Sequence, residues 1–255
     1  MTIAHGINDD GEIVGVYIDA HTQRGHGFLL ADGIFITIDV PGSPNTHAYG
    51  INKQGAIVGA YDGDTHGFVL ENGPPTTIDA PGSTESVVYG INQHGDVVGL
   101  YRDATSGRFH AFVRSDDDFT TLDVPPGGSG SGIMNFLGIN DHNEIVGGYP
   151  DPTVGGRTRG FLLSKGVFTP IDVPGSVGTG ALGINGHGDV VGLYIDARTH
   201  QTRGFVLSKG SFASIDVPGS TNTSVYGINA KGQLVGFYTD ANGTQHGFLA
   251  TPLKK

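Results

Sequence analysis

The chain has 255 residues, and its 14 Lys and Arg against 25 Asp and Glu give a formal charge of −11. This acidic balance argues against nucleic acid, whose binding needs basic side chains to displace counterions, and against docking on anionic membranes. The absence of Cys excludes disulfides, thiolate metal sites and a cysteine nucleophile. No apolar run is long enough to span a membrane. We therefore expect no nucleic-acid partner and no membrane partner.

The triplet Gly-Ile-Asn occurs six times, at intervals of 40 to 48 residues. Each triplet is followed by a Val-Gly-x-Tyr run, then by His/Arg-Gly/Ala-Phe, and in five repeats by a segment close to Phe-x-x-Ile-Asp-Val-Pro-Gly-Ser. Four short β-type segments at this period are typical of a β-propeller blade. The sequence predicts one all-β domain, a six-bladed β-propeller over residues 1–255, and a monomer. The repeats lie near residues 5–46, 49–86, 89–136, 137–181, 182–224 and 226–255.

The second repeat illustrates the expected strands. We predict strands at 48–52, 56–61, 67–70 and 76–80, with tight turns at 52–55 and 71–73 and a break at Pro81. The second strand is continuously apolar, as in a strand covered on both faces. Its glycine recurs in all six repeats and indicates close approach of a neighbouring strand or blade.

The turn between the first two strands of each repeat has a constant length. Gly stands at its end in five repeats, and Asn, which best tolerates a left-handed backbone among the other residues, stands there in the fourth. The sequence therefore predicts positive φ at Gly11, Gly55, Gly95, Asn143, Gly188 and Gly232.

The sixth repeat lacks a fourth segment, since the chain ends soon after Phe248-Leu249-Ala250. Either this blade has three strands, or a fourth strand once preceded Met1. We expect four-stranded blades with one incomplete blade at the termini. We also expect residues 2–7 to pack on the sixth blade and close the ring.

His110-Ala111-Phe112 and its variants at residues 26–28, 66–68 and 246–248, together with the Gly-Ile-Asn motif, resemble the bacterial HAF extracellular repeat family. The resemblance covers nearly the whole chain. It implies an extracellular or periplasmic protein, although no signal peptide is visible, and it implies no common activity. No catalytic residue can be carried over from it.

Antiparallel order places the loops after the second and fourth strands of every repeat on one face, which we call the top face. These loops vary in length, and variable loops on a rigid scaffold are where function usually sits. We therefore predict a ligand site on the top face at the central opening, with catalytic residues left unassigned.

A Tyr ends the second strand of each repeat, and an Asp lies two residues later in five of them. These residues could hold a divalent metal ion or hydrogen-bond a polar ligand, whereas a structural interpretation makes each Asp the start of an Asx turn. The candidate ligand-binding residues are Tyr17, Asp19, Tyr61, Tyr101, Asp103, Tyr149, Tyr194, Asp196, Tyr238 and Asp240.

A basic or imidazole side chain precedes the third strand of each repeat. Imidazole can bind metal or act as a general base, but exchange between His and Arg favours a shared hydrogen-bond donor within the blade. This second set of candidate ligand-binding residues comprises His26, His66, His110, Arg159, Arg203 and His246.

The Asp of each Ile/Leu-Asp-Val/Ala-Pro segment is expected to bond the backbone of the next blade: Asp39, Asp79, Asp123, Asp172 and Asp216. Residues that break the repeat are further site candidates, namely His21, His47, Arg102, Asn135, Phe136, Arg157 and His200. The Gly/Ser run at 127–132 lacks the Lys-Ser/Thr of a phosphate loop.

Two functions remain open at the level of sequence. The first is a metal-assisted hydrolase of esters, lactones or phosphoesters, with metal-activated water in the central opening. The second is a non-catalytic module that binds glycans or a protein. One deep central pocket would favour the first, and similar aromatic-lined pockets between blades would favour the second.

Overall fold

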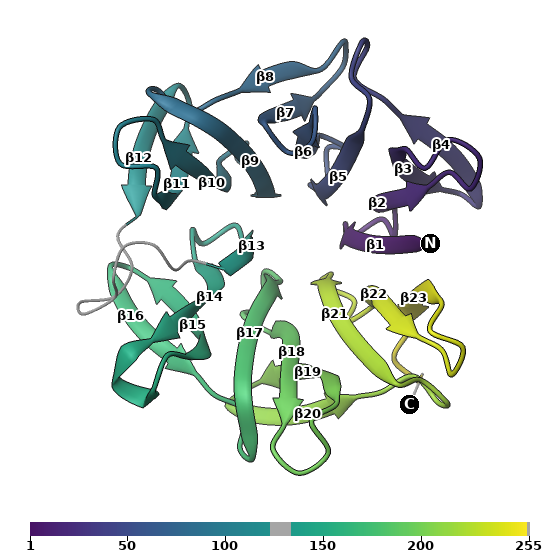
Figure 1. Cartoon of the computed structure of the whole chain (residues 1–255), viewed down its shortest axis with the longest axis vertical. Coiled ribbons are helices and arrows are strands. Elements are labelled where there is room, and N and C mark those ends of the chain that lie inside the picture. Colours follow the sequence, from purple (N-terminus) through teal and green to yellow (C-terminus); the bar gives the residue numbers. More distant parts are fainter. Residues whose placement is uncertain (123–133, 254–255) are drawn as a thin grey trace.

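The computed structural model describes residues 1–122 and 134–253, without the side chains of residues 134–136. Six small antiparallel sheets stand around a central axis, confirming the predicted all-β, six-bladed propeller (Figure 1). The predictions for Asp123, for the run at 127–132 and for the side chains of Asn135 and Phe136 fall outside the described residues.

Within each sheet the strands follow chain order from the axis outwards (Figure 1). The innermost strands are β1 (Thr2–Ile7), β5 (Thr46–Ile51), β9 (Ser83–Ile91), β13 (Met134–Ile139), β17 (Ser176–Ile184) and β21 (Asn222–Ile228). The second strands are β2 (Ile13–Ile18), β6 (Ile57–Tyr61), β10 (Val97–Asp103), β14 (Ile145–Asp151), β18 (Val190–Asp196) and β22 (Leu234–Thr239).

The third strands are β3 (Gly25–Ala31), β7 (His66–Leu70), β11 (Phe109–Ser115), β15 (Arg157–Ser164), β19 (Thr202–Ser208) and β23 (Gln245–Ala250). Five sheets have an outer fourth strand: β4 (Ile34–Ile38), β8 (Thr76–Ile78), β12 (Asp118–Leu122), β16 (Val167–Ile171) and β20 (Ser211–Ile215). Within the described residues the sixth sheet has three strands, which agrees with the predicted incomplete blade at the termini. A 3-10 turn (η1, Pro152–Val154) follows β14.

The core lies between the blades. Val14 and Ile38 of the first blade pack with Ala48 and Phe68 of the second, and the same arrangement recurs around the ring. The second-strand glycine fits the prediction of close approach. A Cβ on Gly59 would collide with the carbonyl oxygen of His47 on the neighbouring strand β5.

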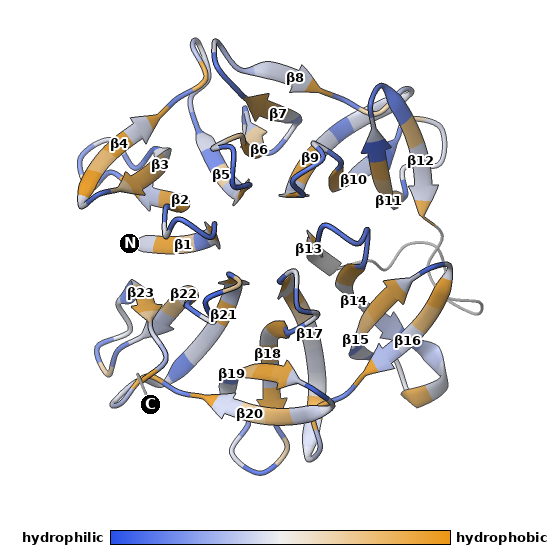
Figure 2. Ribbon diagram, turned by 180° about the vertical axis from the view of Figure 1, so that it is seen from behind, coloured by the Kyte–Doolittle hydropathy of each residue, from blue (hydrophilic) through white to orange (hydrophobic). Residues whose placement is uncertain are grey.

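The turns after the innermost strands have the predicted backbone. Gly11, Gly55, Gly95, Asn143, Gly188 and Gly232 all have positive φ, between 57° and 90°. The turns themselves are hydrophilic (Figure 2). Their Asn side chains do more than the predicted turn formation, because each Oδ1 caps its own turn while the Nδ2 group donates to a turn of the next blade, as in Asn8 to Asn52 O (3.1 Å).

This belt of asparagines runs around the propeller. It passes from Asn52 to Asn92 and from Asn140 to Asn185 to Asn229, and Asn92 donates to Asn143 Oδ1 between them. Asn229 Nδ2 then donates to Asn8 O at 2.9 Å, and Ala230 N donates to Asp9 Oδ1 at 2.8 Å. The sixth blade is thereby joined to the first, as the sequence predicted, and β1 packs beside it.

Candidate functional site

The sixteen predicted ligand-binding residues lie at the top ends of the second and third strands, where Tyr and His or Arg face one another across the sheet. Tyr17 pairs with His26, and Tyr149 pairs with Arg159. Because these strands stand outside the innermost one, the residues are displaced from the axis. Two channel cavities among the described residues are lined by the innermost strands and the turns after them, and none of the sixteen lines either cavity. The expectation that they border the central opening is corrected accordingly.

The four histidine blades share one arrangement, in which the imidazole stacks on the tyrosine ring. Ring centroids are 5.1 to 5.4 Å apart, and the planes are inclined by 23° to 28°. All eight rings are half-buried. The stacked pairs are Tyr17–His26, Tyr61–His66, Tyr101–His110 and Tyr238–His246.

A carboxylate and a hydroxyl complete the set in the first two blades. His26 Nδ1 lies 2.9 Å from Asp39 Oδ1, and His66 Nδ1 lies 2.7 Å from Asp79 Oδ2. The tyrosine hydroxyl bonds a threonine of the outer strand in three blades, as Tyr61 does with Thr77 at 2.8 Å. Tyr61 also packs against the apolar cluster formed with the first blade, so the stacked pair lies between blades. We call the Tyr, His and outer-strand Asp of one blade a triad.

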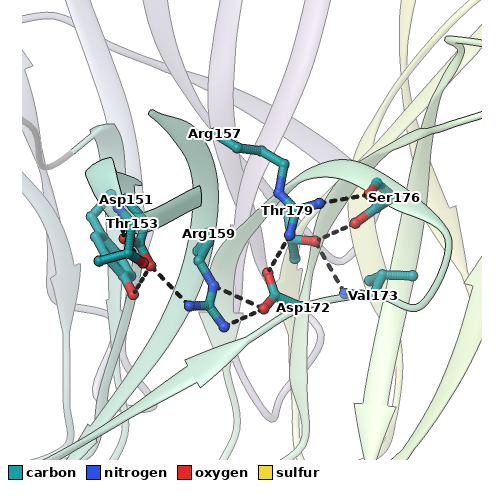
Figure 3. Close-up of polar contacts among 9 residues, drawn as sticks. Asp151, Thr153, Arg157, Arg159, Asp172, Val173, Ser176 and Thr179 are labelled. Atoms are coloured by element: carbon teal, nitrogen blue, oxygen red, sulfur yellow. Dashed lines mark hydrogen bonds and ion pairs between the residues drawn. The ribbon is translucent and has the colours of Figure 1, made fainter. Parts of the chain in front are cut away.

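The fourth and fifth blades carry Arg in place of this His, and their polar contacts differ from those of the histidine blades. Arg159 binds Asp172 through Nε at 2.8 Å and Asp151 through Nη1 at 2.8 Å (Figure 3). Hydrogen bonds from Thr153 and Arg159 lower the pKa of Asp151 to about 2. In the fifth blade Arg203 binds Asp216 at 2.7 Å. The neighbouring tyrosines, Tyr149 and Tyr194, are buried in these blades.

The outer-strand aspartates therefore differ from the prediction. Asp39, Asp79, Asp172 and Asp216 pair with His or Arg of their own blade rather than with the backbone of the next one. The bond to the next blade is made instead by a buried hydroxyl. Val40 N donates to Thr46 Oγ1 at 2.9 Å, and Ser86, Thr179 and Thr223 accept in the same way. A Ser or Thr three residues after each Pro-Gly-Ser is the signal that could have predicted this bond.

The aspartates that follow the second strands start Asx turns, which supports their structural interpretation. Asp19 accepts hydrogen bonds from the backbone N–H groups of His21 and Thr22 and from the Thr22 hydroxyl. These bonds, chiefly those from Thr22, lower the pKa of Asp19. Asp103 and Asp196 accept equivalent bonds, and the pKa values of both carboxyl groups are lowered. The pKa of Asp240 is lowered chiefly by its hydrogen bond with His246 and then by that from Thr244 N.

The residue before each Gly-Ile-Asn triplet lines the channel, and sequence reasoning missed it. These positions hold His5, Tyr49, Tyr89, Leu137, Leu182 and Tyr226 around a cavity of about 90 Å³. A signal for these positions was present in the sequence, because the residue before the constant Gly-Ile-Asn triplet varies from repeat to repeat. His5 contacts the edges of Tyr49 and Tyr226, with centroids 5.0 and 4.9 Å apart.

Burial keeps this wall uncharged. Desolvation, with a smaller contribution from the neighbouring His47, lowers the pKa of His5 to about 3. Desolvation also raises the pKa of Tyr226 to about 12, and it raises that of Tyr49 and Tyr89 with a contribution from Asp64. At neutral pH the wall therefore consists of neutral phenols, a neutral imidazole and aliphatic groups.

His47, one of the residues singled out for breaking the repeat, lies beside this wall. Its Nδ1 is 2.9 Å from Asp64 Oδ1 and 3.1 Å from the Tyr49 hydroxyl. The other described residues that break the repeat serve local contacts or lie at the surface. Arg102 pairs with Glu85, and Arg157 bonds Ser176 O (Figure 3). His21 and His200 are exposed.

The channel cavities lined by the described residues are smaller than the deep pocket expected of a hydrolase. Its cavities measure about 90 and 120 Å³, whereas small-molecule pockets usually enclose about 300–1,000 Å³. Within the described residues, no three His, Asp or Glu side chains are grouped so that they could hold a metal ion. The divalent metal suggested by the sequence therefore has no evident donor set in the part of the chain that the structure covers.

No protein-family model and no curated protein matches the chain. Solved structures do match its fold. A putative TolB from Agrobacterium tumefaciens aligns over 98% of this chain and 85% of its own, with a TM-score of 0.64 and 11% identity. A lectin of Aleuria aurantia, studied with Fucα1-6GlcNAc, aligns over 97% and 90%, with a TM-score of 0.58 and 10% identity.

Virginiamycin B lyase from Staphylococcus aureus aligns over 96% of this chain and 83% of its own, with a TM-score of 0.52 and 13% identity. At these identities the likeness shows the propeller fold alone. Across the described ranges, 1–122 and 134–253, the structure contains no helix that is long and apolar enough to cross a membrane.

Proposed function

We propose that this protein is a non-catalytic glycan-binding module and that the stacked Tyr–His pairs between its blades, completed to triads in the first two, hold the sugars. The observation that carries the proposal is the repetition of one half-exposed aromatic pair, with a carboxylate beside it in the first and second blades. Similar aromatic sites between blades are what distinguish a repeated binding module from an enzyme with one central pocket.

The chemistry of a triad suits a neutral sugar. A tyrosine ring offers an apolar face with a polar tip, and ionised carboxylates accept hydrogen bonds while imidazole can donate or accept them. The side chain of Asp39 is 47% exposed and that of Asp79 is 36% exposed, so both can still accept bonds from sugar hydroxyls. The formal charge of −11 is compatible with a neutral ligand and unfavourable for an acidic one.

The blades would not contribute equally. In the fourth and fifth blades the guanidinium already satisfies the carboxylate, and the tyrosine is buried. We therefore assign binding to Tyr17, His26, Tyr61, His66, Tyr101, His110, Tyr238 and His246, and assign a structural role to the Arg-containing blades. Several weak sites on one rigid ring can act together on a multivalent surface and raise the apparent affinity without new contacts.

Two similarities support this proposal. The Aleuria aurantia lectin, described as a six-bladed β-propeller with a fucose recognition mode, shows that this architecture can hold sugars. The resemblance to the HAF repeat family implies export, which would bring such a module to extracellular glycans.

An array of neutral mono- and oligosaccharides, including fucosylated disaccharides, tests the proposal. We expect at least one class to bind with several equivalent sites in calorimetry. The double variant Tyr17→Ala/Tyr61→Ala should reduce the number of sites by two. Lys231→Ala, an exposed change in a turn on the opposite face, serves as the matched control. Absence of binding to any sugar, or an unchanged number of sites in a folded double variant, would refute the proposal.

A further inference from the structure

The aromatic residues of the channel wall are gathered on one side of the ring. The sixth, first, second and third blades are consecutive around the axis, and each places a ring before its Gly-Ile-Asn triplet, whereas the fourth and fifth blades place a leucine there (Figure 1). The four rings are those of His5, Tyr49, Tyr89 and Tyr226. The cavity of about 90 Å³ is therefore bordered by aromatic rings on one side and by aliphatic groups on the other.

The second blade departs from the repeat at the top of this channel. His47 lies near the start of β5, where the equivalent residue of the first blade is Ile3. The loop between β6 and β7 is also short, because its flanking Tyr and His are five residues apart instead of the eight to ten found in the other blades. This loop carries Asp64 with a left-handed backbone, at a φ of 65°.

These departures bring a carboxylate to the aromatic wall. Asp64 Oδ1 lies 2.9 Å from His47 Nδ1, and the Tyr49 hydroxyl donates to the same oxygen at 3.3 Å. The His47 ring is held against the first blade, since a Cβ on Gly25 of β3 would lie 2.7 Å from its Nε2. The loop carboxylate of the first blade, Asp19, bonds N–H groups of its own loop, whereas Asp64 is bonded to the channel wall.

The electrostatics of this side favour a cation. Burial lowers the pKa of His5 to about 3, so that its imidazole carries no positive charge at neutral pH. Desolvation and, as the next cause, the negative charge of Asp64 raise the pKa values of Tyr49 and Tyr89. The field of the carboxylate therefore reaches two phenols of the wall. Among the described residues that line the cavity there is no Lys or Arg to oppose it.

We propose that this part of the channel binds a methylated ammonium group, with the rings of the wall around its methyl groups and Asp64 as its counter-charge. Aromatic rings attract cations, most strongly where the site is desolvated. The methyl groups of such a cation suit the leucine side of the wall. The Asp64 side chain is 41% exposed, so that it remains accessible to a ligand in spite of its bonds to His47 and Tyr49.

The cavity has room for the head group rather than for a whole ligand. A cavity of about 150 Å³ can hold benzene, so the channel, at about 90 Å³, suits a smaller group such as trimethylammonium. The remainder of the ligand would extend towards the top face. Two sources share this chemistry, namely a free quaternary ammonium compound such as choline and the side chain of a trimethylated lysine.

A ligand-observed NMR titration with choline tests the proposal. The control ligand is the neutral analogue of choline in which a tert-butyl group replaces trimethylammonium, and we expect choline to bind at least tenfold more tightly. Asp64→Asn keeps an acceptor oxygen and tolerates the left-handed backbone, and it should weaken choline binding at least tenfold. Asp62→Asn, at an exposed carboxylate of the same loop with a φ of 56°, is the matched control and should bind choline like the wild type.

A second variant tests the aromatic wall without removing a partner of Asp64. Tyr226→Leu places at this position the residue found at 137 and 182, so the variant should fold, and its choline binding should be weakened at least fivefold. Tyr17→Ala, which removes a ring assigned to sugar binding, should leave choline binding unchanged. The cation site and the sugar sites are thereby tested separately.

The amide of N-acetyl-trimethyllysine distinguishes the two sources. Binding at least tenfold tighter than that of choline would indicate a modified protein side chain, and any weaker binding would indicate a free ammonium compound. Equal binding of choline and its neutral analogue would refute the proposal, as would the absence of choline binding. Undiminished binding by folded Asp64→Asn or Tyr226→Leu would place the cation elsewhere on this acidic protein and overturn the assignment.

Discussion

At the residue scale, the feature with the clearest energetic consequence is His5 in the channel wall. Its imidazole is buried, with Tyr49 and Tyr226 at its edges, and its pKa falls from 6.5 to about 3. Between these values the unfolded chain binds a proton that the folded chain excludes. Stability is therefore unaffected by this group at neutral pH and decreases as the pH falls below 6.5.

We predict that replacing His5 by Leu, the residue at the equivalent positions 137 and 182, makes stability less dependent on pH. At pH 5 the His5 imidazole alone should cost the wild type about 2 kcal/mol relative to pH 7. Denaturant unfolding at pH 7 and pH 5 measures this difference for both proteins. Equal losses in the two proteins would mean that His5 is protonated while folded.

The residue scale also shows where sequence reasoning stopped. The Tyr and His or Arg candidates were found because they recur, and the structure pairs them across neighbouring strands. Their distance from the axis was missed, because antiparallel order fixes which end of a strand a residue occupies but not how far that strand stands from the centre. Residues such as Tyr89 stand directly before the constant Gly-Ile-Asn triplet, but only the topology shows that this position faces the channel.

At the element scale, the hairpin formed by the first and second strands of a blade is the unit that the sequence specified best. The strands at Thr46–Ile51 and Ile57–Tyr61 begin and end within two residues of their predicted bounds. Turn chemistry explains this accuracy, since Asn52 accepts from Ala56 N at 2.9 Å and Gly55 has a φ of 80°. The inter-blade bond made by Asn52 Nδ2 could not be predicted, because it joins residues 40 apart in the chain.

We predict that Gly55→Val destabilises the protein by about 1–2 kcal/mol, because a β-branched residue is strained at positive φ. Gln54→Val, at the exposed neighbouring position, is the control for adding an apolar side chain to the turn. Thermal unfolding of the two variants measures the difference. If both variants unfold at the same temperature, the left-handed conformation carries no measurable cost.

At the scale of the whole molecule, the sixth and first blades meet where the chain begins and ends (Figure 1). Strand β1 supplies the buried Ala4 and Ile7, and Asn8 O accepts the last bond of the asparagine belt. The six repeats predicted this closure of the ring. The expected bond from Asp39 to the backbone of the next blade was wrong, because Asp39 pairs with His26 of its own blade. Both are long-range contacts, but only the first follows from counting repeats.

We predict that deleting residues 1–8 destabilises the ring far more than removing residues 254 and 255. The first change takes away the inner strand of one blade and opens its junction with Asn229. Differential scanning calorimetry of both truncations should show a broadened, lowered transition for the first alone. Similar transitions for the two truncations would show that β1 is not required for closure.

The bond from Asn229 to Asn8 has the same donor and acceptor atoms as the bond from Asn8 to Asn52. The belt therefore makes no distinction between blades that are consecutive in the chain and the two that meet at its ends. The bond between neighbouring blades is the same whichever blade comes first in the chain. A circular permutant that begins at another Gly-Ile-Asn hairpin should therefore assemble the same ring. The asparagine bonds that join neighbouring blades therefore do not depend on which hairpin carries the chain termini.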